Sequence, residues 1–577
     1  MKKTAAWLAV HALEALGVRY TFGIPGVHNT ELYDELNKSR SITPILVTHE
    51  GGGAFMADGL SRVSGDAIGV LAIVPAAGFT HAASGIGEAF LDGIPMLVIS
   101  GGIRTDTGRR YQLHGIDLLA LARPITKAAF RVERHEDVVR TIFEAHRIAT
   151  TGVPGPVLVE LPVNLQLFAG EAGEIPAWQR PLPAPLPEAK LIEDAAALLR
   201  GAKRPGIFAG WGARGAVDEL AEIAERLQAP VSTTLQGLAS FPADHPLHAG
   251  FGFSPSAVPA ARNAFRDCDA MLAVGTRFGE IPTGSFAAVV PKALVHVDID
   301  PAVFDANYPA QVRLAGDARA VLAALATQLR AQEAKPSNTA LQEQIARDKR
   351  AYRDEWLAHD SGGRINPLHF FDELRRQAPA DAITVLDDGN HTYLAAELFP
   401  IGRGGRLLTP TDFNAMGYAV PAAIGAKLGR PGSEVHAIVG DGCFRMTCME
   451  LVTAVARGVG IACFVFHDGH LSQIAQAQEM PYNRKPCTVL GAVDIAAIAA
   501  ATGAEYIDVP DTNALPGAIA RARELAAASR PVVVDIPIDY SRRTAFTAGT
   551  TRSMFRRFPL SQRLRFAGRA LVRKLTG

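Results

Sequence analysis

Short apolar runs alternate with longer amphipathic stretches along the first 168 residues. The runs have the length of buried strands, and stretches such as 50–64 carry apolar residues at helical spacing. Strands that alternate with helices predict a parallel sheet with helices on both faces. The predicted strands of this unit are 19–23, 45–48, 68–74, 95–100 and 156–161.

The same alternation returns twice and divides the chain into three α/β units. Strands are predicted at 205–209, 270–275 and 293–298 in the second unit, and at 382–386, 435–439, 461–466 and 531–536 in the third. The expected segments are a first domain 1–168, a proline-rich linker 169–190, a middle domain 191–335, a polar helical connector 336–365, a third domain 366–545 and a tail 546–577. We therefore expect an α/β protein with three doubly wound, parallel-sheet domains.

Composition narrows the class of protein. The 577 residues are too many for one small binding module, and 48% hydrophobic residues exclude a mainly disordered chain. Basic and acidic residues balance to a formal net charge of zero, which argues against a nucleic-acid partner. Five cysteines without metal-type spacing favour a reduced, cytoplasmic compartment. The first residues predict a helix rather than a signal peptide, and no run reaches the roughly 18 apolar residues of a membrane span.

The C-terminal tail differs from the rest in charge and pattern. Residues 551–577 contain eight Lys or Arg and no acidic residue. Five apolar residues fall on one face of a helix through this segment: Leu560, Leu564, Ala567, Leu571 and Leu575. We expect a helix that docks on the body of the protein. The alternative is an interfacial helix that contacts a membrane surface or a partner.

Two neighbouring predicted strands end in polar, glycine-containing tips. One runs into Gly440-Asp441-Gly442-Cys443, and the next runs into Asp468-Gly469-His470. One strand–helix–strand unit separates the aspartates, so both are expected at the edge where open α/β sheets bind ligands. Two carboxylates there suit Mg²⁺, which completes its octahedron with phosphate oxygens and water. The glycines would let the main chain approach a diphosphate closely.

These two tips resemble the diphosphate and magnesium motif of thiamine diphosphate enzymes. The resemblance implies that the side chains of Asp441 and Asp468 and the main-chain carbonyl of His470 are metal ligands. The family usually has Asn where Asp468 stands. The site of this chain is therefore expected to carry one more negative charge.

A second segment, Val47-Thr48-His49-Glu50 followed by three glycines, runs from a predicted strand into a helix. Taken alone, Glu50 is an acid that favours a helix N-terminus. The segment also resembles the cofactor-activating glutamate segment of thiamine diphosphate enzymes. By that resemblance the Glu50 carboxylate binds the pyrimidine of the cofactor and promotes formation of the C2 ylid.

The resemblance extends from about residue 20 to about residue 537, toward the group of acetolactate synthases, benzaldehyde lyases and 2-oxoacid decarboxylases. It makes the first domain pyrimidine-binding, the third diphosphate-binding and the middle one Rossmann-like. Asp388-Gly389-Asn390-His391 is similar to a diphosphate-contacting turn, and Met416 matches the residue wedged between the cofactor rings. The implied cofactor contacts are Glu50, Gly389, Asn390, His391, Asn414, Met416, Gly440, Asp441, Gly442, Cys443, Asp468 and His470.

The same resemblance places substrate-facing residues. Gln112 matches a glutamine over the reacting centre, His28 matches a histidine of benzaldehyde lyases, and both are expected to be catalytic with Glu50. The paired histidines of some decarboxylases are not matched, because only His114 stands at that place. The expected substrate pocket contains His114, Gln473 and Ala477. Ala477 stands where acetolactate synthases carry a tryptophan, so a wider acceptor pocket is expected.

The activity implied is a carbon–carbon lyase or carboligase that acts on 2-oxo acids or 2-hydroxyketones through a C2 ylid and an enamine. The alternatives are a simple 2-oxoacid decarboxylase and a non-catalytic, cofactor-binding relative. The resemblance also implies a homodimer or homotetramer in which Glu50 and Asp441 of one site come from different subunits. A glycine-rich turn, 210–215, follows a middle-domain strand and leaves FAD or another dinucleotide open as a further ligand.

Overall fold

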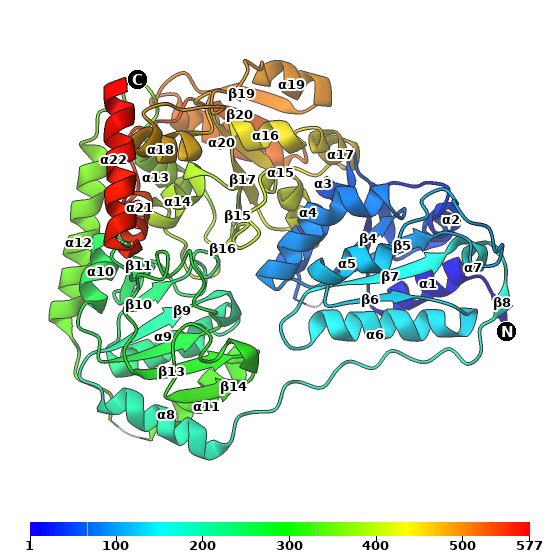
Figure 1. The fold of residues 1–577 in the computed structure, drawn as a ribbon, viewed down its shortest axis with the longest axis horizontal. Coiled ribbons are helices and arrows are strands. Elements are labelled where there is room, and N and C mark those ends of the chain that lie inside the picture. The colour runs from blue at the N-terminus through cyan, green and yellow to red at the C-terminus, as the bar shows by residue number, and fades with distance from the viewer. Residues whose placement is uncertain (66, 332, 577) are drawn as a thin grey trace.

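The computed structural model describes residues 1–65, 67–331 and 333–576. Three six-stranded sheets follow one another along the chain, and every strand pair within them is parallel. Helices cover the sheets on both faces (Figure 1). The predicted fold class, three doubly wound α/β domains, is confirmed.

The first sheet has the strand order β3–β2–β4–β5–β7–β6. Its strands are β2 (Tyr20–Gly23), β3 (Thr43–Leu46), β4 (Gly69–Ile73), β5 (Met96–Gly102), β6 (Ala128–Arg131) and β7 (Pro156–Pro162), and its main helices are α1 (Ala5–Ala15), α2 (Thr30–Lys38), α3 (Glu50–Val63), α4 (Ala77–Asp92) and α6 (Val138–Thr150). Strand β3 ends two residues earlier than predicted. Thr48 and His49 therefore form the turn that leads into α3.

The second sheet has the order β11–β10–β9–β12–β13–β14. It comprises β9 (Pro205–Ala209), β10 (Val231–Thr233), β11 (His248–Phe251), β12 (Ala270–Val274), β13 (Ala293–Asp298) and β14 (Val312–Ala315), with helices α8 (Ala189–Gly201), α9 (Val217–Leu227), α10 (Pro259–Phe265) and α11 (Ala318–Arg330). The linker before it, 172–188, has no helix or strand. The connector after it forms the long helix α12 (Thr339–Leu357).

The third sheet has the order β16–β15–β17–β18–β20–β19. Its strands are β15 (Ile383–Leu386), β16 (Arg406–Leu408), β17 (Val435–Gly440), β18 (Ala462–Phe466), β19 (Glu505–Asp508) and β20 (Val532–Ile536). Its helices are α13 (Pro367–Gln377), α14 (Asn390–Leu398), α15 (Ala419–Gly429), α16 (Asp441–Thr447), α17 (Glu450–Arg457), α18 (Ser472–Tyr482), α19 (Ile495–Thr502) and α20 (Leu515–Ala527).

The first and third domains of the chain share a helix interface. Helix α3 lies against α15, and all residues of α3 are buried. The two backbones touch, because a Cβ at Gly59 would lie 2.2 Å from the Ala422 carbonyl oxygen and one at Gly425 would lie 1.9 Å from that of Met56. One hydrophobic core runs through both domains, from Leu71 and Ile73 to Val439.

The tail folds into α21 (Ala545–Arg557) and α22 (Leu560–Thr576), and α22 lies beside α18 (Figure 1). The predicted helix is present and packs against α18, but it does not do so through its apolar face. Leu560, Leu564, Leu571 and Leu575 are 59–78% exposed, whereas Arg573 donates to the Pro481 carbonyl at 2.8 Å. No helix in the described ranges is both long and apolar enough to cross a bilayer.

Candidate active site

The carboxyl ends of three strands of the third sheet carry the predicted cofactor residues. Gly389 and Asn390 start α14 after β15, Asp441 starts α16 after β17, and Asp468 and His470 follow β18. Because β15, β17, β18 and β20 are adjacent, these tips lie at one edge of the sheet. The structure thus brings together the residues that the sequence assigned to diphosphate and metal binding.

Asp441 and Asp468 face the same space. Asp441 is buried, and its Oδ2 accepts a hydrogen bond from the Gly469 amide at 2.9 Å, which ties the β17 tip to the β18 tip. Burial raises the pKa of Asp441, and the neighbouring Asp468 charge adds to the rise. Within the described residues no cluster of three metal-binding side chains exists. The predicted ligand set needs two carboxylates and one main-chain carbonyl, so it does not require such a cluster.

Several buried polar atoms around these carboxylates have no partner within the described residues. They are Asp388 Oδ1, Asn390 Nδ2, His391 Nε2 and the Tyr540 hydroxyl. Burial lowers the pKa of His391 to about 3, so its ring is neutral. Burial, then Asp468 and Asp441, raise the pKa of Tyr540. Unpaired buried polar atoms are costly unless a ligand satisfies them, so this edge fits a polar, phosphate-bearing ligand.

The segment 411–417 carries Asn414 and Met416 over this edge. Asn414 has a left-handed backbone with φ +62°, and the Met416 Cε lies 3.9 Å from where a Cβ of Gly442 would stand. Asp387 accepts hydrogen bonds from the amides of Gly417 and Ala419 at 2.8 and 2.7 Å. These bonds fix the direction in which the segment enters α15.

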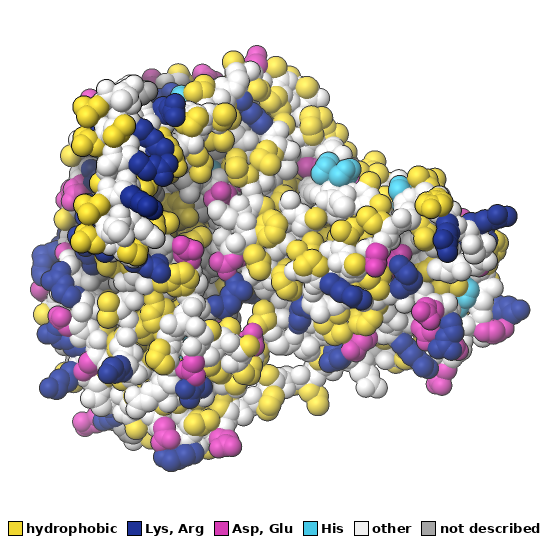
Figure 2. All heavy atoms as spheres, in the orientation of Figure 1, with side chains coloured by type: hydrophobic (Ala, Val, Ile, Leu, Met, Phe, Trp, Pro, Cys, Tyr) yellow, Lys and Arg dark blue, Asp and Glu magenta, His cyan; other side chains and the backbone are white. Residues whose placement is uncertain are grey.

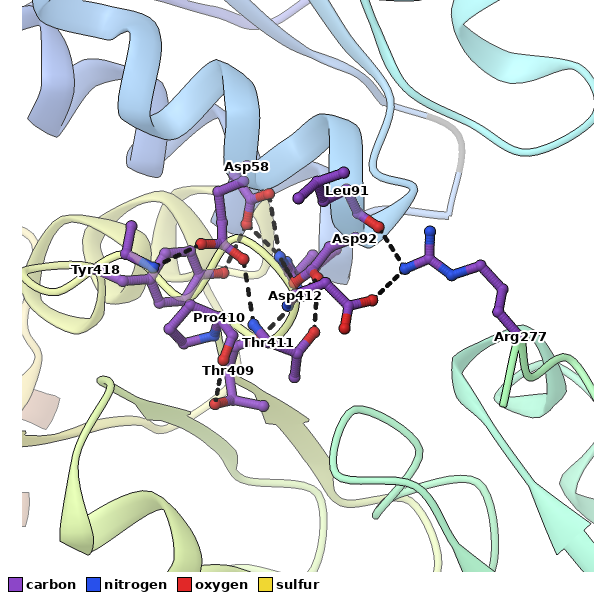
Figure 3. A network of polar contacts seen from close by, with 12 residues as sticks. Asp58, Leu91, Asp92, Arg277, Thr409, Pro410, Thr411, Asp412 and Tyr418 are labelled. Carbon is purple, nitrogen blue, oxygen red and sulfur yellow. Dashed lines mark hydrogen bonds and ion pairs between the residues drawn. The ribbon is translucent and has the colours of Figure 1, made fainter. Parts of the chain in front are cut away.

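A buried network joins the same segment to the first domain (Figure 3). Arg62 on α3 pairs with Asp58 at 2.6 Å and with Asp92 on α4 at 2.8 Å, and all three side chains are fully buried. Tyr418 donates to Asp58, and Thr411 donates to Asp92, both at 2.6 Å. From the middle domain, Arg277 reaches Asp412 and the Leu91 carbonyl (Figure 3).

Glu50 lies at the carboxyl edge of the first sheet, where α3 begins after β3. Its carboxylate is buried, and its Oε2 is 3.0 Å from Nδ1 of His81 on α4. The His81 ring stacks on His49, the N-cap residue of α3, with ring centroids 4.7 Å apart. No hydrogen bond or ion pair between described residues joins Glu50 to Asp441, Asp468 or Met416.

His28 and His114 form a pair that the sequence did not predict. Their Nδ1 atoms are 3.1 Å apart, and their rings are tilted with centroids 4.9 Å apart. The loop after β5 itself contains only His114, as the sequence shows, and the fold brings His28 to it from the β2 end. Gln112 lies in that loop, where its amide donates to the Arg104 and Arg109 carbonyls at 2.9 and 3.2 Å.

Gln473 and Ala477 lie one turn apart on α18, just after the Asp468 tip. Gln473 Oε1 is buried without a partner in the described chain, and Ala477 is exposed.

A cavity of about 820 Å³ lies where the linker and the middle domain meet residues of both terminal domains. Its wall includes Gly212 and Gly215 of the glycine-rich turn. The Arg214 guanidinium stacks 3.9 Å from the Trp211 ring centroid. Burial, then Arg62 and Arg406, lower the pKa of Arg214 to about 10. The lining carries charges of both signs, and the groups in it that suit phosphate are Arg180, Arg214 and Arg277 beside Asp92, Asp298, Asp317 and Asp412.

Three sequence families match the chain along its length. The thiamine pyrophosphate enzyme N-terminal TPP binding domain matches residues 3–121, the central domain matches 192–325, and the C-terminal TPP binding domain matches 387–536. The acetolactate synthase large subunit of Corynebacterium glutamicum is 34% identical over 92% of this chain and 86% of its own length. The chain belongs to the thiamine pyrophosphate enzyme family, in its acetolactate synthase group.

Two further relatives have the same extent. A probable acetolactate synthase large subunit of Methanocaldococcus jannaschii is 34% identical over 92% of this chain and 91% of its own. The acetolactate synthase isozyme 3 large subunit of Escherichia coli is 29% identical over 93% and 95%. The chain is thus a thiamine diphosphate-dependent enzyme, and the two matched TPP binding domains are those that carry Glu50 and Asp441.

Two side chains at the site were missed in the sequence. His81 contacts Glu50, and Tyr540 lies near Asp441 and Asp468. His81 lies one turn into α4, and neither a strand end nor the family resemblance marked it in the sequence. Tyr540 follows β20, and only the sheet order places that strand next to β18.

Proposed function

We propose that this chain is a carboligase that acts on 2-oxo acids, as the names of its acetolactate synthase relatives suggest. The observation that carries the proposal is the set of unpaired buried polar atoms around Asp441 and Asp468 at the edge of the third sheet. When bound, thiamine diphosphate supplies the carbon nucleophile and the electron sink for making or breaking a bond next to a carbonyl.

The residues of the chain take complementary roles in this proposal. Asn390, His391 and the N-terminus of α14 bind the diphosphate, because α14 directs free main-chain amides at this edge. Asp441, Asp468 and the His470 carbonyl hold Mg²⁺. The site is lined by the main chain of Gly389, Gly440, Gly442 and Cys443. The cofactor rings are oriented by Asn414 and Met416. The Glu50 carboxyl group holds a proton that faces the pyrimidine of the cofactor.

His28 and His114 are proposed to move a proton at the substrate carbonyl. Gln112 and Gln473 are proposed to orient that carbonyl. In the Nδ1–Nδ1 bond only one ring carries the Nδ1 proton, so the tautomers of the two rings are coupled. Ala477 widens the acceptor pocket relative to a tryptophan. The His28–His114 pair also favours a second candidate function, a simple 2-oxoacid decarboxylase. A proton donor at this place lets the reaction finish by protonation instead of by addition to a second carbonyl compound.

The deciding experiment follows CO₂ and hydroxyketone products from a panel of 2-oxo acids, with and without acetaldehyde or benzaldehyde, after addition of thiamine diphosphate and Mg²⁺. Hydroxyketone formation supports the carboligase, and CO₂ with free aldehyde alone supports the decarboxylase. Glu50→Gln is expected to abolish turnover of either kind while cofactor binding by calorimetry stays nearly unchanged. Unchanged turnover in this variant would overturn the role of Glu50.

We also propose a homodimer or homotetramer in which Glu50 of one subunit faces Asp441 of another. Unpartnered apolar side chains next to His28 and Gln112 support it: Val27, Tyr111, Leu113 and Ile116 are exposed. Mixing Glu50→Gln and Asp441→Asn chains is the test, because mixed dimers then contain one site with both native residues. Restored activity supports the shared site, and its absence in proven mixed dimers contradicts it.

The cavity beside Arg214 is proposed to bind a phosphate-bearing ligand, with FAD as the candidate. Visible absorbance of the purified protein tests whether FAD is bound. A cytoplasmic location is proposed on the five cysteines, none of which forms a disulfide within the described chain.

The helix α22 is proposed to contact an anionic membrane surface. Its leucines face solvent, and the cations Arg565 and Lys574 are exposed on either side of them. Figure 2 shows hydrophobic and basic side chains next to one another along this helix, at the upper left. An apolar stripe flanked by cations is the pattern of helices that lie in a lipid interface.

Flotation with vesicles tests this contact. The protein is expected to float with phosphatidylglycerol vesicles and not with phosphatidylcholine vesicles, and Leu564→Glu with Leu571→Glu is expected to abolish binding. Gln562→Glu with Thr576→Glu adds the same charge away from the stripe and should bind. No flotation with either vesicle, or a smaller oligomer in the leucine variant, would assign the stripe to a protein contact instead.

A further inference from the structure

Glu450, the first residue of α17 in the third domain, reaches into the first domain. Its carboxylate accepts hydrogen bonds from the amides of Thr48 at 3.2 Å and His49 at 3.1 Å, and Thr453 donates to it at 2.8 Å. These amides belong to the turn that places Glu50. Figure 1 shows α17 beside the start of α3.

The contact is specific in shape as well as charge. Glu450 is buried, and a Cβ at Gly52 would stand 2.3 Å from its Oε1, so only glycine leaves room for the carboxylate. From the other end of α17, Arg457 donates to the Pro44 carbonyl in β3 at 2.7 Å. Helix α17 therefore contacts the β3–α3 connection on both sides of the turn, through Glu450 and Arg457.

Glu88 on α4 makes the opposite connection. It is fully buried in the first domain, and its two oxygens accept hydrogen bonds from the amides of Thr411 at 3.2 Å and Ala415 at 2.9 Å in the third domain. These amides flank Asn414 and precede Met416. Burial, then the Asp92 charge, raise the pKa of Glu88.

We propose that Glu450 and Glu88 are reciprocal positioning residues. Each holds, from the other domain of the same chain, the main chain next to a residue that the proposed function assigns to the cofactor: Glu450 for Glu50, and Glu88 for Met416. The inference rests on that proposed function for its consequence in turnover. The physical reason is that a buried carboxylate with two amide donors fixes a turn far more firmly than packing alone.

Hydrogen exchange without cofactor or substrate tests the anchoring directly. Glu450→Ala is expected to raise amide exchange in 44–52 above its effect elsewhere, and Glu88→Ala to do the same in 409–418, although each change lies in the other domain. Glu450→Gln keeps an oxygen that accepts from the turn and should recover most of the protection. Gly52→Ala displaces the carboxylate without removing it and should act like Glu450→Ala.

Leu451→Ala is the matched control, because Leu451 is as buried as Glu450 and lies on the same helix but makes no bond to the turn. It should raise exchange across α17 and its core without selecting 44–52. An equal, chain-wide rise in Glu450→Ala and Leu451→Ala, or no rise in 44–52, would overturn the proposal.

Kinetics then separates positioning from general support. Glu450→Ala is expected to lower kcat about 10- to 100-fold with KM changed less than about three-fold, because a displaced catalytic group costs rate more than substrate binding. Glu450→Gln should restore most of kcat. If the exchange pattern is found but the native protein turns over no 2-oxo acid, the anchoring stands and the proposed function fails. If the native protein turns over 2-oxo acids but the exchange pattern is absent, the anchoring alone is overturned.

Discussion

At the scale of single residues, the site is built from charged and polar groups held away from water. Burial sets their protonation: the His391 ring is neutral, and the pKa of Asp441 is raised. The strand ends that carry Glu50 and Asp441 were predictable because a buried strand followed by a polar tip is visible in the sequence, whereas the role of Glu50 came from the family resemblance of its segment. The pairing of His28 with His114 was not, because 86 residues separate them.

His114→Gln tests how the pair controls protonation. Burial first, and the His114 charge second, lower the pKa of His28, so the variant is expected to raise that pKa toward its ordinary value. If neutral His28 accepts a proton during turnover, activity is lost as the pH falls through this pKa. The acid limb of the kcat/KM profile should therefore move to higher pH. An unshifted limb, or an equal shift in His11→Gln on the distant helix α1, would contradict the assignment.

At the scale of elements, the contact between α3 and α15 decides how the two cofactor-binding domains sit together. Both helices present glycines at the crossing, so their backbones meet with no side chain between them. Sequence patterns predicted α3 closely, since its apolar spacing is regular. Sequence patterns did not predict that the whole surface of α3 would be buried, because one side of the helix is covered by residues of another domain.

Gly425→Ala is expected to destabilise this crossing by about 1–3 kcal/mol, because the new Cβ would stand 1.9 Å from the Met56 carbonyl oxygen. Unfolding in urea, followed by circular dichroism, measures the change. Gly517→Ala in α20 is the control. Its Cβ meets open space, so it should stabilise the protein by about 0.5–1 kcal/mol. Equal effects of the two changes would show that the crossing tolerates a side chain.

At the scale of the whole molecule, three domains converge on one buried ionic network. Arg62 pairs with both Asp58 and Asp92. The network continues through Thr411 and Tyr418 into the third domain (Figure 3). The Arg277 pair with Asp412 adds the middle domain at a half-exposed rim. Such buried pairs add little net stability because desolvation offsets their attraction, but removal of one partner leaves an uncompensated charge in the interior.

Arg62→Met is expected to destabilise the protein by about 3–5 kcal/mol, because it leaves two carboxylates buried without a cation. The loss should be smaller at acidic pH, where those carboxylates take up protons. Denaturant midpoints at two pH values measure both effects. Arg277→Ala, at the exposed end, should cost less than about 1 kcal/mol. A pH-independent loss in Arg62→Met would contradict this explanation.

Local sequence patterns predict the three α/β domains, the strand ends that carry Glu50, Asp441 and Asp468, and the amphipathic tail helix. These features are local, since the hydrophobic period and the polar tips are properties of short segments. The packing of the folded chain sets which carboxylate holds which turn, which histidines pair, and which face of α22 meets solvent. Those outcomes depend on strand order and domain packing, and they join residues such as Thr48 and Glu450, about 400 positions apart, that no local pattern relates.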